Sequence, residues 1–463
     1  MEFNLIAAAT EARFRAASSA RLVNLYPEAV SDGVVALYGT PGLSLLATVG
    51  NGPIRGMMNV GGSLYVVSGS QVYSVASTGI STLLGSIVTA SGMVSMTTDG
   101  NDIQIVDGTA NGWLVNVSTG ALTAITDGDF PGGVTNAFLD GFVLFNEPGT
   151  GKLWATEGYN AGSIDPLSFA TAEGLPDDLV AITVDHREVW LFGEQSTEVW
   201  YNAGTAGFPF ARINGAFLEH GCAAAFSVAK IDNTVFWLGN DDKGAGVVWR
   251  ADGYTPRRIS THDVETAIAG YASVSDAVAW TYQQDGHAFY VLSFGTETWC
   301  YDASTDKWHQ RAAFVNGEYA RHRANTHAML GRQHIVGDYE NGNLYVLDPE
   351  TYTDNGAVLA REFVSPHVRS GKRVGYAEVE LRMETGVGLQ SGQGSDPQVI
   401  LATSDDAGRT WGSWRTTSFG AVGQYLARAV FRRLGSGFGK TFKVRVTDPV
   451  PVAFISARVE FGE

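Results

Sequence analysis

The sequence predicts an all-β protein, a β-propeller of about six or seven blades with an N-terminal arm and a C-terminal β-sandwich-like domain. The main observation is a hairpin pattern that recurs about seven times between Leu64 and Leu347. Each copy is a short β-branched or aromatic strand, a turn rich in Gly, Asn, Asp or Ser, and a second strand. The copies begin at Leu64, Ile103, Phe142, Trp190, Phe236, Phe289 and Ile335.

The spacing of these copies supports the propeller. Their starts lie 39, 39, 48, 46, 53 and 46 residues apart, which matches one four-stranded blade per repeat. The 56 glycines and the low charged content of 17% indicate many tight turns, and no helical period of useful length is present. A propeller is a platform for binding or assembly and does not specify a reaction.

Residues 1–32 form the expected N-terminal arm. The arm carries three basic residues, Arg13, Arg15 and Arg21, and ends in the turn-like sequence NLYPE. No basic segment precedes its short apolar run, so we do not expect a secretory signal. Synthesis and folding in the cytoplasm are therefore expected. A terminal arm of this kind often crosses onto a neighbour or completes a last blade.

Residues 33–360 are assigned to the propeller and residues 361–463 to the C-terminal β domain. After Tyr352 the sequence reads as a linker, and the following strands are longer, more basic and more strictly alternating, for example YAEVELRM at Tyr376–Met383. Alternation of apolar and charged residues marks strands with one buried and one solvated face, as in a sandwich.

Charge is unevenly distributed along the chain. The net charge is −17, yet residues 361–463 hold 14 Lys and Arg against 10 Asp and Glu, which leaves 17 against 38 for residues 1–360. An acidic body argues against adhesion to a nucleic-acid backbone, because such binders neutralise phosphates with basic side chains. Residues 56–98 carry no charge. Their apolar runs are far shorter than the ~20 residues that span a membrane, so no membrane insertion is expected.

One motif has a specific structural meaning. Ser404–Trp411 (SDDAGRTW) fits the Asp-box pattern S-x-D-x-G-x-T-W, in which Ser404 and Asp406 satisfy turn amides, Gly408 takes a positive φ and Trp411 packs under the hairpin. In sialidases this box lies away from the catalytic centre. We therefore interpret it as a structural turn.

Other candidate sites are weaker. GSGFGKT at Gly435–Thr441 lacks the spacing of a phosphate-binding loop. The histidines His322, His327 and His334 fit no common metal scheme and are expected in a polar loop between blades. The two cysteines, Cys222 and Cys300, are expected to be free and buried. No catalytic residue, metal site or cofactor is predicted, and the protein is not expected to be an enzyme.

Four pieces near the N-terminus carry a family resemblance. RLVNLYPE at Arg21–Glu28, GTPGL at Gly39–Leu43, GPIRGM at Gly52–Met57 and GGSLYVVSGSQVY at Gly61–Tyr73 together resemble the packaged-DNA stabilisation protein, or tail hub, of short-tailed bacteriophages. The similarity in overall plan extends over nearly the whole chain. The residues of this chain that match the family motif are markers of the fold and have no catalytic role: Asn24, Tyr26, Pro27, Pro41, Gly42 and Arg55.

The resemblance implies a virion structural protein of the phage tail. Members of that family assemble as a ring, typically a hexamer, below the portal and adaptor, and prolong the channel through which double-stranded DNA leaves. They help to retain packaged DNA and attach the tail needle or tip and the tailspikes or fibres. No catalytic residues come with the family.

The charge pattern allows two further expectations. Acidic propeller faces are expected to border the DNA channel, since they would repel phosphate and let DNA slide. The basic residues of the C-terminal domain and the arm are possible interface residues, although an ordinary solvated strand face would have the same composition; those of the C-terminal domain are Arg428, Arg432, Arg433, Lys440, Lys443 and Arg445. The alternatives to a virion component are a propeller lectin or glycan hydrolase, suggested by the Asp-box, and a cellular propeller scaffold that binds peptides.

Overall fold

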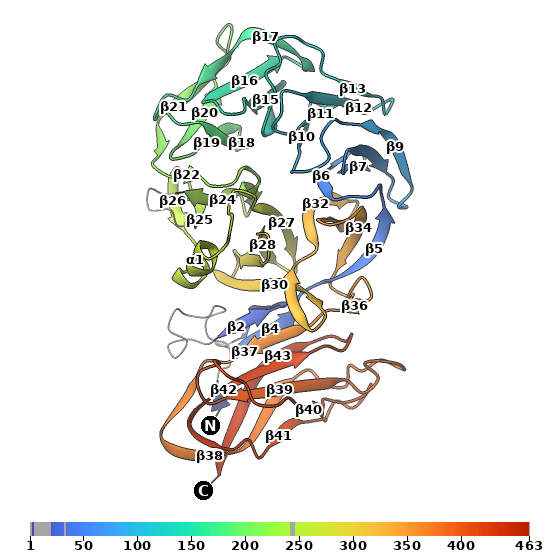
Figure 1. The fold of residues 1–463 in the computed structure, drawn as a ribbon, viewed down its shortest axis with the longest axis vertical. Coiled ribbons are helices and arrows are strands. Elements are labelled where there is room, and N and C mark those ends of the chain that lie inside the picture. Colours follow the sequence, from blue (N-terminus) through green and yellow to red (C-terminus); the bar gives the residue numbers. More distant parts are fainter. Residues whose placement is uncertain (1, 4–19, 32–33, 241–245, 463) are drawn as a thin grey trace.

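A computed structural model of the chain describes residues 2–3, 20–31, 34–240 and 246–462. These residues form a propeller that stands on a smaller β-sandwich (Figure 1). The described part of the propeller has seven blades, and their inner strands meet in a closed ring around the axis, with the 3-10 turn η1 of blade 5 lying against the first strand of blade 4. The predicted fold class is confirmed.

The blades are numbered here in chain order. Blades 1 to 4 are β6–β9 (Ile54–Val60, Ser63–Ser68, Gln71–Val75, Ser81–Ser86), β10–β13 (Ser95–Thr98, Asp102–Val106, Gly112–Asn116, Leu122–Ala124), β14–β17 (Asn136–Leu139, Phe142–Asn146, Lys152–Glu157, Asn160–Thr171) and β18–β21 (Leu179–Asp185, Glu188–Gly193, Thr197–Asn202, Phe210–Leu218). Blades 5 to 7 are β22–β26 (Gly221–Cys222, Ala229–Ile231, Thr234–Asn240, Val247–Asp252, Thr255–Arg258), β27–β30 (Val278–Gln284, His287–Ser293, Thr298–Asp302, Lys307–Val315) and β32–β34 with β5 (Ala324–Leu330, Gln333–Asp338, Asn343–Asp348, Gly42–Thr48).

Each of the seven predicted hairpins forms the two middle strands of a blade. The first, which begins at Leu64, is β7 and β8, and the last, which begins at Ile335, is β33 and β34. Middle strands are covered on both faces by the neighbouring blades, so they need apolar residues on both sides. Val66 and Val67 of β7, for example, are adjacent in sequence and both fully buried. This double burial explains why the middle hairpins produce the clearest apolar pattern in the sequence.

The ring is closed by a strand from the other end of the chain. β5 is the outer strand of blade 7 and pairs antiparallel with β34, in a register that places Leu43 opposite Leu347. Gly42 begins this strand, and its N–H donates to the carbonyl oxygen of Thr351 (2.9 Å). A β-carbon at Gly42 would collide with that oxygen and would lie 2.5 Å from the carbonyl oxygen of Thr353. The closure therefore requires glycine here because of the close approach of two backbones.

The sandwich combines C-terminal and N-terminal strands. Its strands are β37 (Arg361–Val364), β38 (Val368–Met383), β39 (Gln398–Ser404), β40 (Arg415–Ser418), β41 (Ala429–Arg432), β42 (Ser436–Val446) and β43 (Ala453–Gly462), joined by β1 (Glu2–Phe3), β2 (Arg21–Val23), β3 (Leu25–Ser31) and β4 (Val34–Gly39). β38 pairs with β41, β42 and β43, and β42 pairs with β39. β3 and β4 form a hairpin, and β4 continues the sheet beyond β43.

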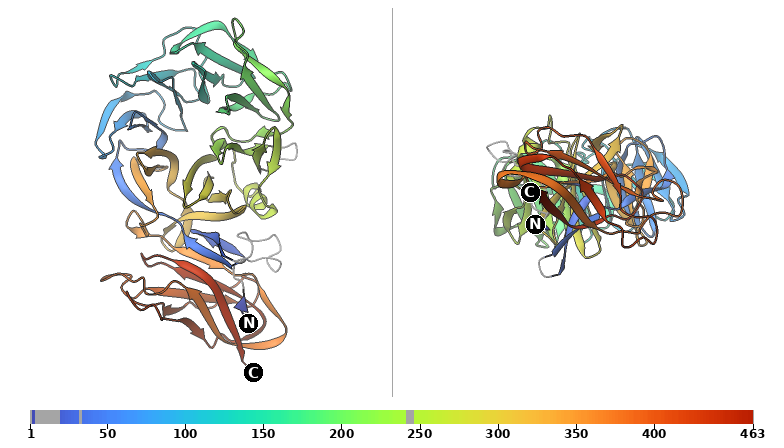
Figure 2. Two further views of the ribbon diagram at one scale, coloured as in Figure 1. Left: turned by 180° about the vertical axis from the view of Figure 1, so that it is seen from behind. Right: turned by 90° about the horizontal axis from the view of Figure 1, so that it is seen from below.

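The two domains share one continuous sheet. β2 pairs in parallel with β30 of blade 6 and antiparallel with β37, and β37 pairs with β42. The expected boundary at residue 33 falls between β3 and β4, whereas the structure pairs these two strands with each other and with the sandwich. In Figures 1 and 2 this N-terminal hairpin lies between the propeller and the sandwich.

The minor elements are short. β31 (Glu318–Arg321) extends β30, and β35 (Thr353–Asp354) and β36 (Ala357–Val358) lead out of blade 7. The 3-10 turn η1 (Ala225–Ser227) and the helix α1 (His262–Ala269) lie in blade 5 and its link to blade 6. Thr261 caps α1 by accepting a hydrogen bond from Val264 N (3.4 Å). None of the described helices has the length and apolar character needed to cross a membrane.

The closing glycine gives a first prediction. Gly42→Ala should lower the free energy of unfolding by about 3 kcal/mol, because the added methyl group meets backbone that belongs to the last blade and cannot turn away. Urea unfolding followed by tryptophan fluorescence measures this change.

The matched control for this substitution is Gly158→Ala. A β-carbon added at Gly158 would have no heavy atom within 4 Å apart from its chain neighbours, and the backbone there has no positive φ. Its replacement should therefore leave the unfolding midpoint within experimental error. Equal stability of the Gly42→Ala protein and the natural chain would contradict the closure argument.

Candidate functional site

Asn24 lies at the centre of the junction between the two domains. Its backbone adopts φ of +53°, a left-handed conformation that Asn tolerates better than most residues. Its side-chain amide donates to the carbonyl oxygens of Ala312 (2.8 Å) and Ala360 (2.9 Å), and its side-chain oxygen accepts from Ala312 N (2.9 Å). Ala312 belongs to blade 6, whereas Ala360 directly precedes β37. One side chain therefore ties both domains together.

The backbone of Asn24 makes two further links. Its N–H donates to the carbonyl oxygen of Gln310 (2.9 Å), and its own carbonyl oxygen accepts from Thr40 N (3.1 Å). The residue is only 1% exposed, and a buried amide of this kind is costly unless its donors and acceptors are satisfied. Each of these groups has a partner here. The fold marker Asn24 thus has a structural reason for its place in the motif.

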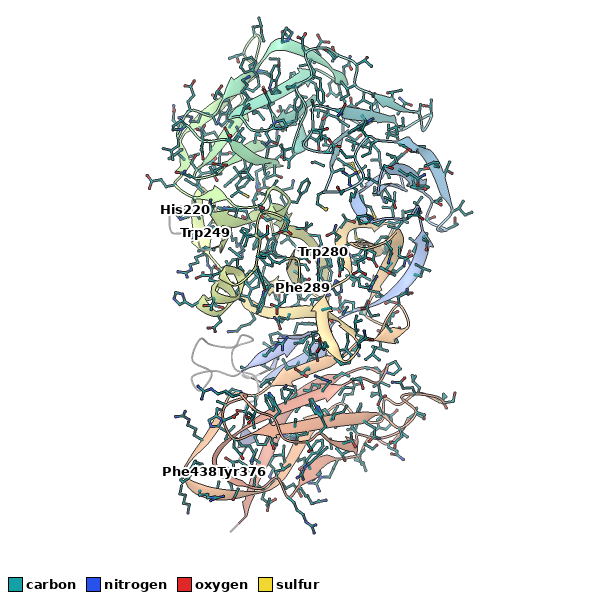
Figure 3. All side chains as sticks on the ribbon, viewed as in Figure 1. His220, Trp249, Trp280, Phe289, Tyr376 and Phe438 are labelled. Atoms are coloured by element: carbon teal, nitrogen blue, oxygen red, sulfur yellow. The ribbon has the colours of Figure 1, made fainter. Side chains whose placement is uncertain are left out.

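Tyr26 anchors the N-terminal hairpin against blade 6. The Tyr26 ring lies edge-on to Phe289, with centroids 5.4 Å apart, and 5.1 Å from the His287 ring. Burial raises the pKa of Tyr26 to about 12. Pro27 lies opposite Leu37 in the hairpin. Phe289 is labelled in Figure 3, close to the junction.

Arg55 is fully buried at the link between blades 1 and 2. Its guanidinium donates to the carbonyl oxygens of Gly69 (2.9 Å), Thr89 (2.8 Å), Ser91 (2.8 Å) and Gly92 (2.6 Å), and to the Thr89 hydroxyl (2.9 Å). The five donors of arginine match this set of acceptors. Arg55 therefore fixes the loop between the blades. The markers Pro41 and Gly42 lie at the start of the closing strand described above.

Two of the predicted interface arginines belong to a charged ladder on the sandwich. Arg428 makes a bidentate ion pair with Glu380 (2.7 and 2.8 Å), and Arg432 pairs with Glu378 (2.9 Å). The hydrogen bonds from Arg428 lower the pKa of Glu380. Exposed pairs of this kind contribute little to stability. Their charges are nevertheless already engaged by carboxylates of the same chain.

The remaining basic residues of the sandwich are mostly engaged within the chain. Lys440 is 3% exposed and pairs with Asp405 (2.5 Å), and Arg445 pairs with the buried carboxylate of Glu362 (2.7 Å). The Lys443 ammonium lies 4.1 Å from the Trp411 ring centroid, a cation–π contact.

The other predicted interface residues lie in the arm and at the end of β41. Arg21 donates to Gln310 (2.6 Å), and Arg433, which follows β41, is exposed. Arg13 and Arg15 lie outside the described residues. An intersubunit role for the basic set stays a prediction.

The Asp-box forms the expected structural turn. The Ser404 hydroxyl donates to Asp406 (2.7 Å) and accepts from Gly408 N (2.8 Å), and Asp406 accepts from both the N–H (2.8 Å) and the hydroxyl (2.7 Å) of Thr410. These bonds hold the pKa of Asp406 well below its usual range. Gly408 has φ of +86°. Both carboxylate oxygens of Asp406 are thus committed to the turn.

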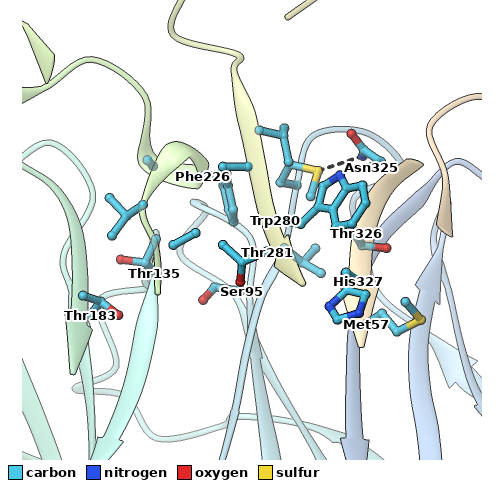
Figure 4. A pocket seen from close by; sticks show the side chains of 18 of the residues that line it. Met57, Ser95, Thr135, Thr183, Phe226, Trp280, Thr281, Asn325, Thr326 and His327 are labelled. Atoms are coloured by element: carbon cyan, nitrogen blue, oxygen red, sulfur yellow. Dashed lines mark hydrogen bonds between the residues drawn. The ribbon is translucent and has the colours of Figure 1, made fainter. Parts of the chain in front are cut away.

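A cavity of about 320 Å³ lies on the propeller axis (Figure 4). None of its lining residues is Asp, Glu, Lys or Arg; the side chains labelled in Figure 4 are Met57, Ser95, Thr135, Thr183, Phe226, Trp280, Thr281, Asn325, Thr326 and His327. Burial lowers the pKa of His327 to about 3, so this side chain is neutral as well. The cavity is therefore an uncharged space between the inner strands.

The histidines do not form a metal site. His327 and His334 share a hydrogen bond (2.9 Å), and burial lowers the pKa of His322 to about 3. The expected polar loop is wrong for His327 and His334, because they belong to the paired strands β32 and β33. Among the described residues no group of three or more His, Cys, Asp or Glu side chains is placed to hold a metal ion.

The cysteines are free and buried, as predicted. Cys222 donates to the carbonyl oxygen of Ala224 (3.2 Å), and burial raises its pKa to about 11, which opposes the thiolate that a nucleophile needs. The neighbouring His220 packs against Trp249, with ring centroids 4.2 Å apart (Figure 3).

A buried carboxyl group that the sequence did not reveal lies where β35 pairs with the closing strand β5; this pairing is called the closing seam here. Asp354 of β35 lies opposite Leu43 of β5 and is 6% exposed, with its Oδ1 atom unpaired. Burial raises its pKa to about 6, despite the lowering influence of Arg323, which pairs with Asp338 (2.7 Å). No local pattern marks this residue, because the strand that buries it lies some three hundred positions earlier in the chain.

Two family models match the chain. The model described as bacteriophage P22 Gp10, beta-propeller, matches residues 8–352, and the model described as bacteriophage P22 Gp10, beta-sandwich, matches residues 360–462. No curated protein matches the sequence. The two models follow one another as the propeller and the sandwich do in the structure.

Solved structures resemble the chain only distantly. The WD40 β-propeller domain of Doa1 is 12% identical with a TM-score of 0.43, covering 66% of this chain and 96% of that chain. The N-terminal domain of Nup159 is 9% identical with a TM-score of 0.43, covering 70% and 97%. The designed Ika8 protein is 14% identical with a TM-score of 0.41, covering 71% and 99%. Similarities of this size carry no functional argument.

The junction gives a second prediction. Asn24→Ala should lower the free energy of unfolding by about 3 kcal/mol, because it removes three buried side-chain hydrogen bonds and strains a left-handed backbone. Asn24→Gly relieves the backbone strain but not the lost bonds, so it should be intermediate between alanine and the natural residue. Guanidinium unfolding of all three proteins measures the order, and an alanine variant as stable as the natural chain would refute the role of Asn24.

The seam gives a pH prediction. The folded-state pKa of Asp354 is about 6 against an ordinary 3.8, so the folded chain holds this proton more tightly than the unfolded chain does. The stability due to this group is complete below about pH 4 and is lost as the pH rises through 6. Asp354→Asn should therefore be more stable than the natural chain at pH 7.5, by up to about 3 kcal/mol, and the gain should shrink towards pH 4. A pH-independent difference in thermal midpoint would contradict this assignment.

Proposed function

Since the chain belongs to the bacteriophage P22 Gp10 family and is a structural protein of a phage tail, we propose that it is the tail hub, or nozzle, of a short-tailed phage. Identical chains form a ring, as a hexamer, below the portal and adaptor. The ring prolongs the channel, helps to retain packaged DNA and attaches the tail needle or tip and the tailspikes or fibres. The observation that carries this proposal is the match of both family models in the order propeller, then sandwich.

The junction supports a mechanical role of this kind. A hub must transmit force between the head above and the tail accessories below without bending between its domains. The continuous sheet through β30, β2, β37 and β42 resists such bending, since it links the domains by backbone hydrogen bonds and not by a flexible linker. The bonds of Asn24 to both domains reinforce the same joint.

The charge distribution supports passage of DNA without adhesion. Residues 1–360 hold 38 Asp and Glu against 17 Lys and Arg, and basic residues of the sandwich such as Lys440 and Arg445 are engaged by carboxylates of the same chain. Proteins that grip DNA gain affinity from free basic side chains on its phosphates. A channel wall built from this chain would offer few such groups.

The experiment is complementation of a phage whose gene for this chain is interrupted. Heads should package DNA and then lose it, because the channel below the portal is not closed, and the full chain supplied from a plasmid should restore both DNA retention and infectivity. Nuclease-protected DNA per head and negative-stain images of the tail are the measurements.

The control is the same phage complemented by a protein with Leu167→Ala, an exposed side chain of β17 (77% exposed). It should behave like the natural chain. Heads that keep their DNA and carry complete tails without this protein would overturn the proposal. Particles that keep DNA but lack needle or spikes would overturn the retention role alone.

A further inference from the structure

One long segment of the propeller brings no exposed charge of its own to the surface, although the Thr89 hydroxyl within it donates to the carboxylate of Asp107. Between Asp32 and Asp99 the only charged residue is Arg55, and its guanidinium is buried. This stretch supplies β5 and the whole of blade 1. We call the outward part of it, residues 42–48 and 76–92, the uncharged rim. In a chain of net charge −17, a segment of this length without an acidic residue is unusual.

The uncharged rim also exposes large apolar side chains. They are Leu45 (50% exposed), Ile80 (70%), Leu83 (51%) and Val88 (75%). The parts of the rim are contiguous, since Gly79 lies against the carbonyl oxygen of Leu46. Arg55 holds the loop that bears Val88 through its bonds to Thr89, Ser91 and Gly92. Contiguous exposed apolar groups on a rigid surface are typical of protein–protein contacts.

The outer strand of blade 1, β9, has a register irregularity beside Tyr73 but lacks the other usual protections of a sheet edge. Within the described residues β9 pairs only with β8, and its sequence, STLLGS, has neither charge nor proline. Edge strands normally avoid aggregation by being short, charged, interrupted by proline or covered.

The other outer strands show these protections. β13 has three residues, β17 contains Asp165 and Pro166, β21 contains Arg212, and β26 contains Pro256 and two arginines. β30 is covered by β2 and β31, and β5 pairs with β35. β9 lies at the periphery of the propeller in Figure 1. The contrast within one molecule indicates that β9 is shielded by something outside the chain.

We propose that the uncharged rim is the face on which a second copy of this chain packs. Two copies that each carry −17 charges repel one another wherever acidic surfaces meet. That repulsion is absent where one of them presents no charge. A basic partner would instead gain by binding the acidic surface, whereas an identical acidic copy avoids repulsion at a face such as this one, so we take the identical copy as the occupant. This inference rests on the proposed ring, and in a ring the rim meets a different surface of its neighbour.

The test is site-specific photo-cross-linking in assembled tails. A photoreactive phenylalanine analogue replaces Val88 in one protein and Leu167 in the control; both positions are about equally exposed (75% and 77%), but Leu167 lies in blade 3. Irradiated tails should give a cross-linked product of twice the chain mass from position 88 and not from position 167. Mass spectrometry identifies the joined peptides.

The possible outcomes distinguish a failure of the rim inference from a failure of the ring proposal. A position-88 product that contains a different tail protein, or no product at all in tails that hold several copies of the chain, overturns the rim. Tails that hold a single copy, counted by native mass spectrometry, overturn the ring proposal itself. Cross-linking of position 88 to DNA would show that the rim lines the channel and would also overturn the inference.

A second measurement uses charge on the same face. Leu83→Asp combined with Val88→Asp should reduce tail assembly at least about tenfold, since two charges would be placed in an apolar contact, each lowering the affinity roughly tenfold or more. Leu167→Asp should leave assembly unchanged. Thermal unfolding of the purified variant should match the natural chain, because both positions are exposed. Normal assembly of the double variant would overturn the inference.

Discussion

The hydrogen bonds of Asn24 are the constraint on which the arrangement of this chain depends. A single buried amide joins blade 6, the start of the sandwich and the link to the closing strand. The chain leaves this point in two directions: β3 and β4 enter the sandwich sheet, and β5 closes the propeller. The N-terminal segment thus completes both domains. Their relative position is set by backbone pairing around this residue, together with the apolar contacts of Tyr26 on blade 6.

This construction suits a protein made of many small cores. Neighbouring blades share separate apolar clusters, such as Trp190, Phe192 and Trp237 between blades 4 and 5, and the sandwich has its own cluster. No single core holds the described residues together. The fold therefore depends strongly on the closure of the ring by β5 and on the junction between the two domains. Glycine at position 42 and asparagine at position 24 are required by close approach and by hydrogen bonding, and both are residues of the family motif.

The candidate site was only partly readable from the sequence. The Asp-box was identified correctly as a turn because its hydrogen bonds are local, joining Ser404 to Gly408 and Asp406 to Thr410. The basic residues of β42 were visible, but their partners were not: Arg445 meets Glu362, which lies 83 positions away. The sequence also did not reveal that arginines near the junction are buried. Arg311 and Arg361 pack beside the rings of Tyr282 and Tyr352, and such contacts depend on strands that are remote in the sequence.

The sequence by itself determined the fold class, the seven middle hairpins and the family. These depend on local alternation, on turn residues and on double burial of the middle strands, all of which leave a pattern within a short stretch of chain. Only the tertiary structure decided that β5 closes blade 7, that β3 and β4 belong to the sandwich sheet and that Asp354 is buried at the seam. The physical reason is that these features depend on pairing between segments hundreds of residues apart. The residues of one partner carry no mark of which strand the other will be.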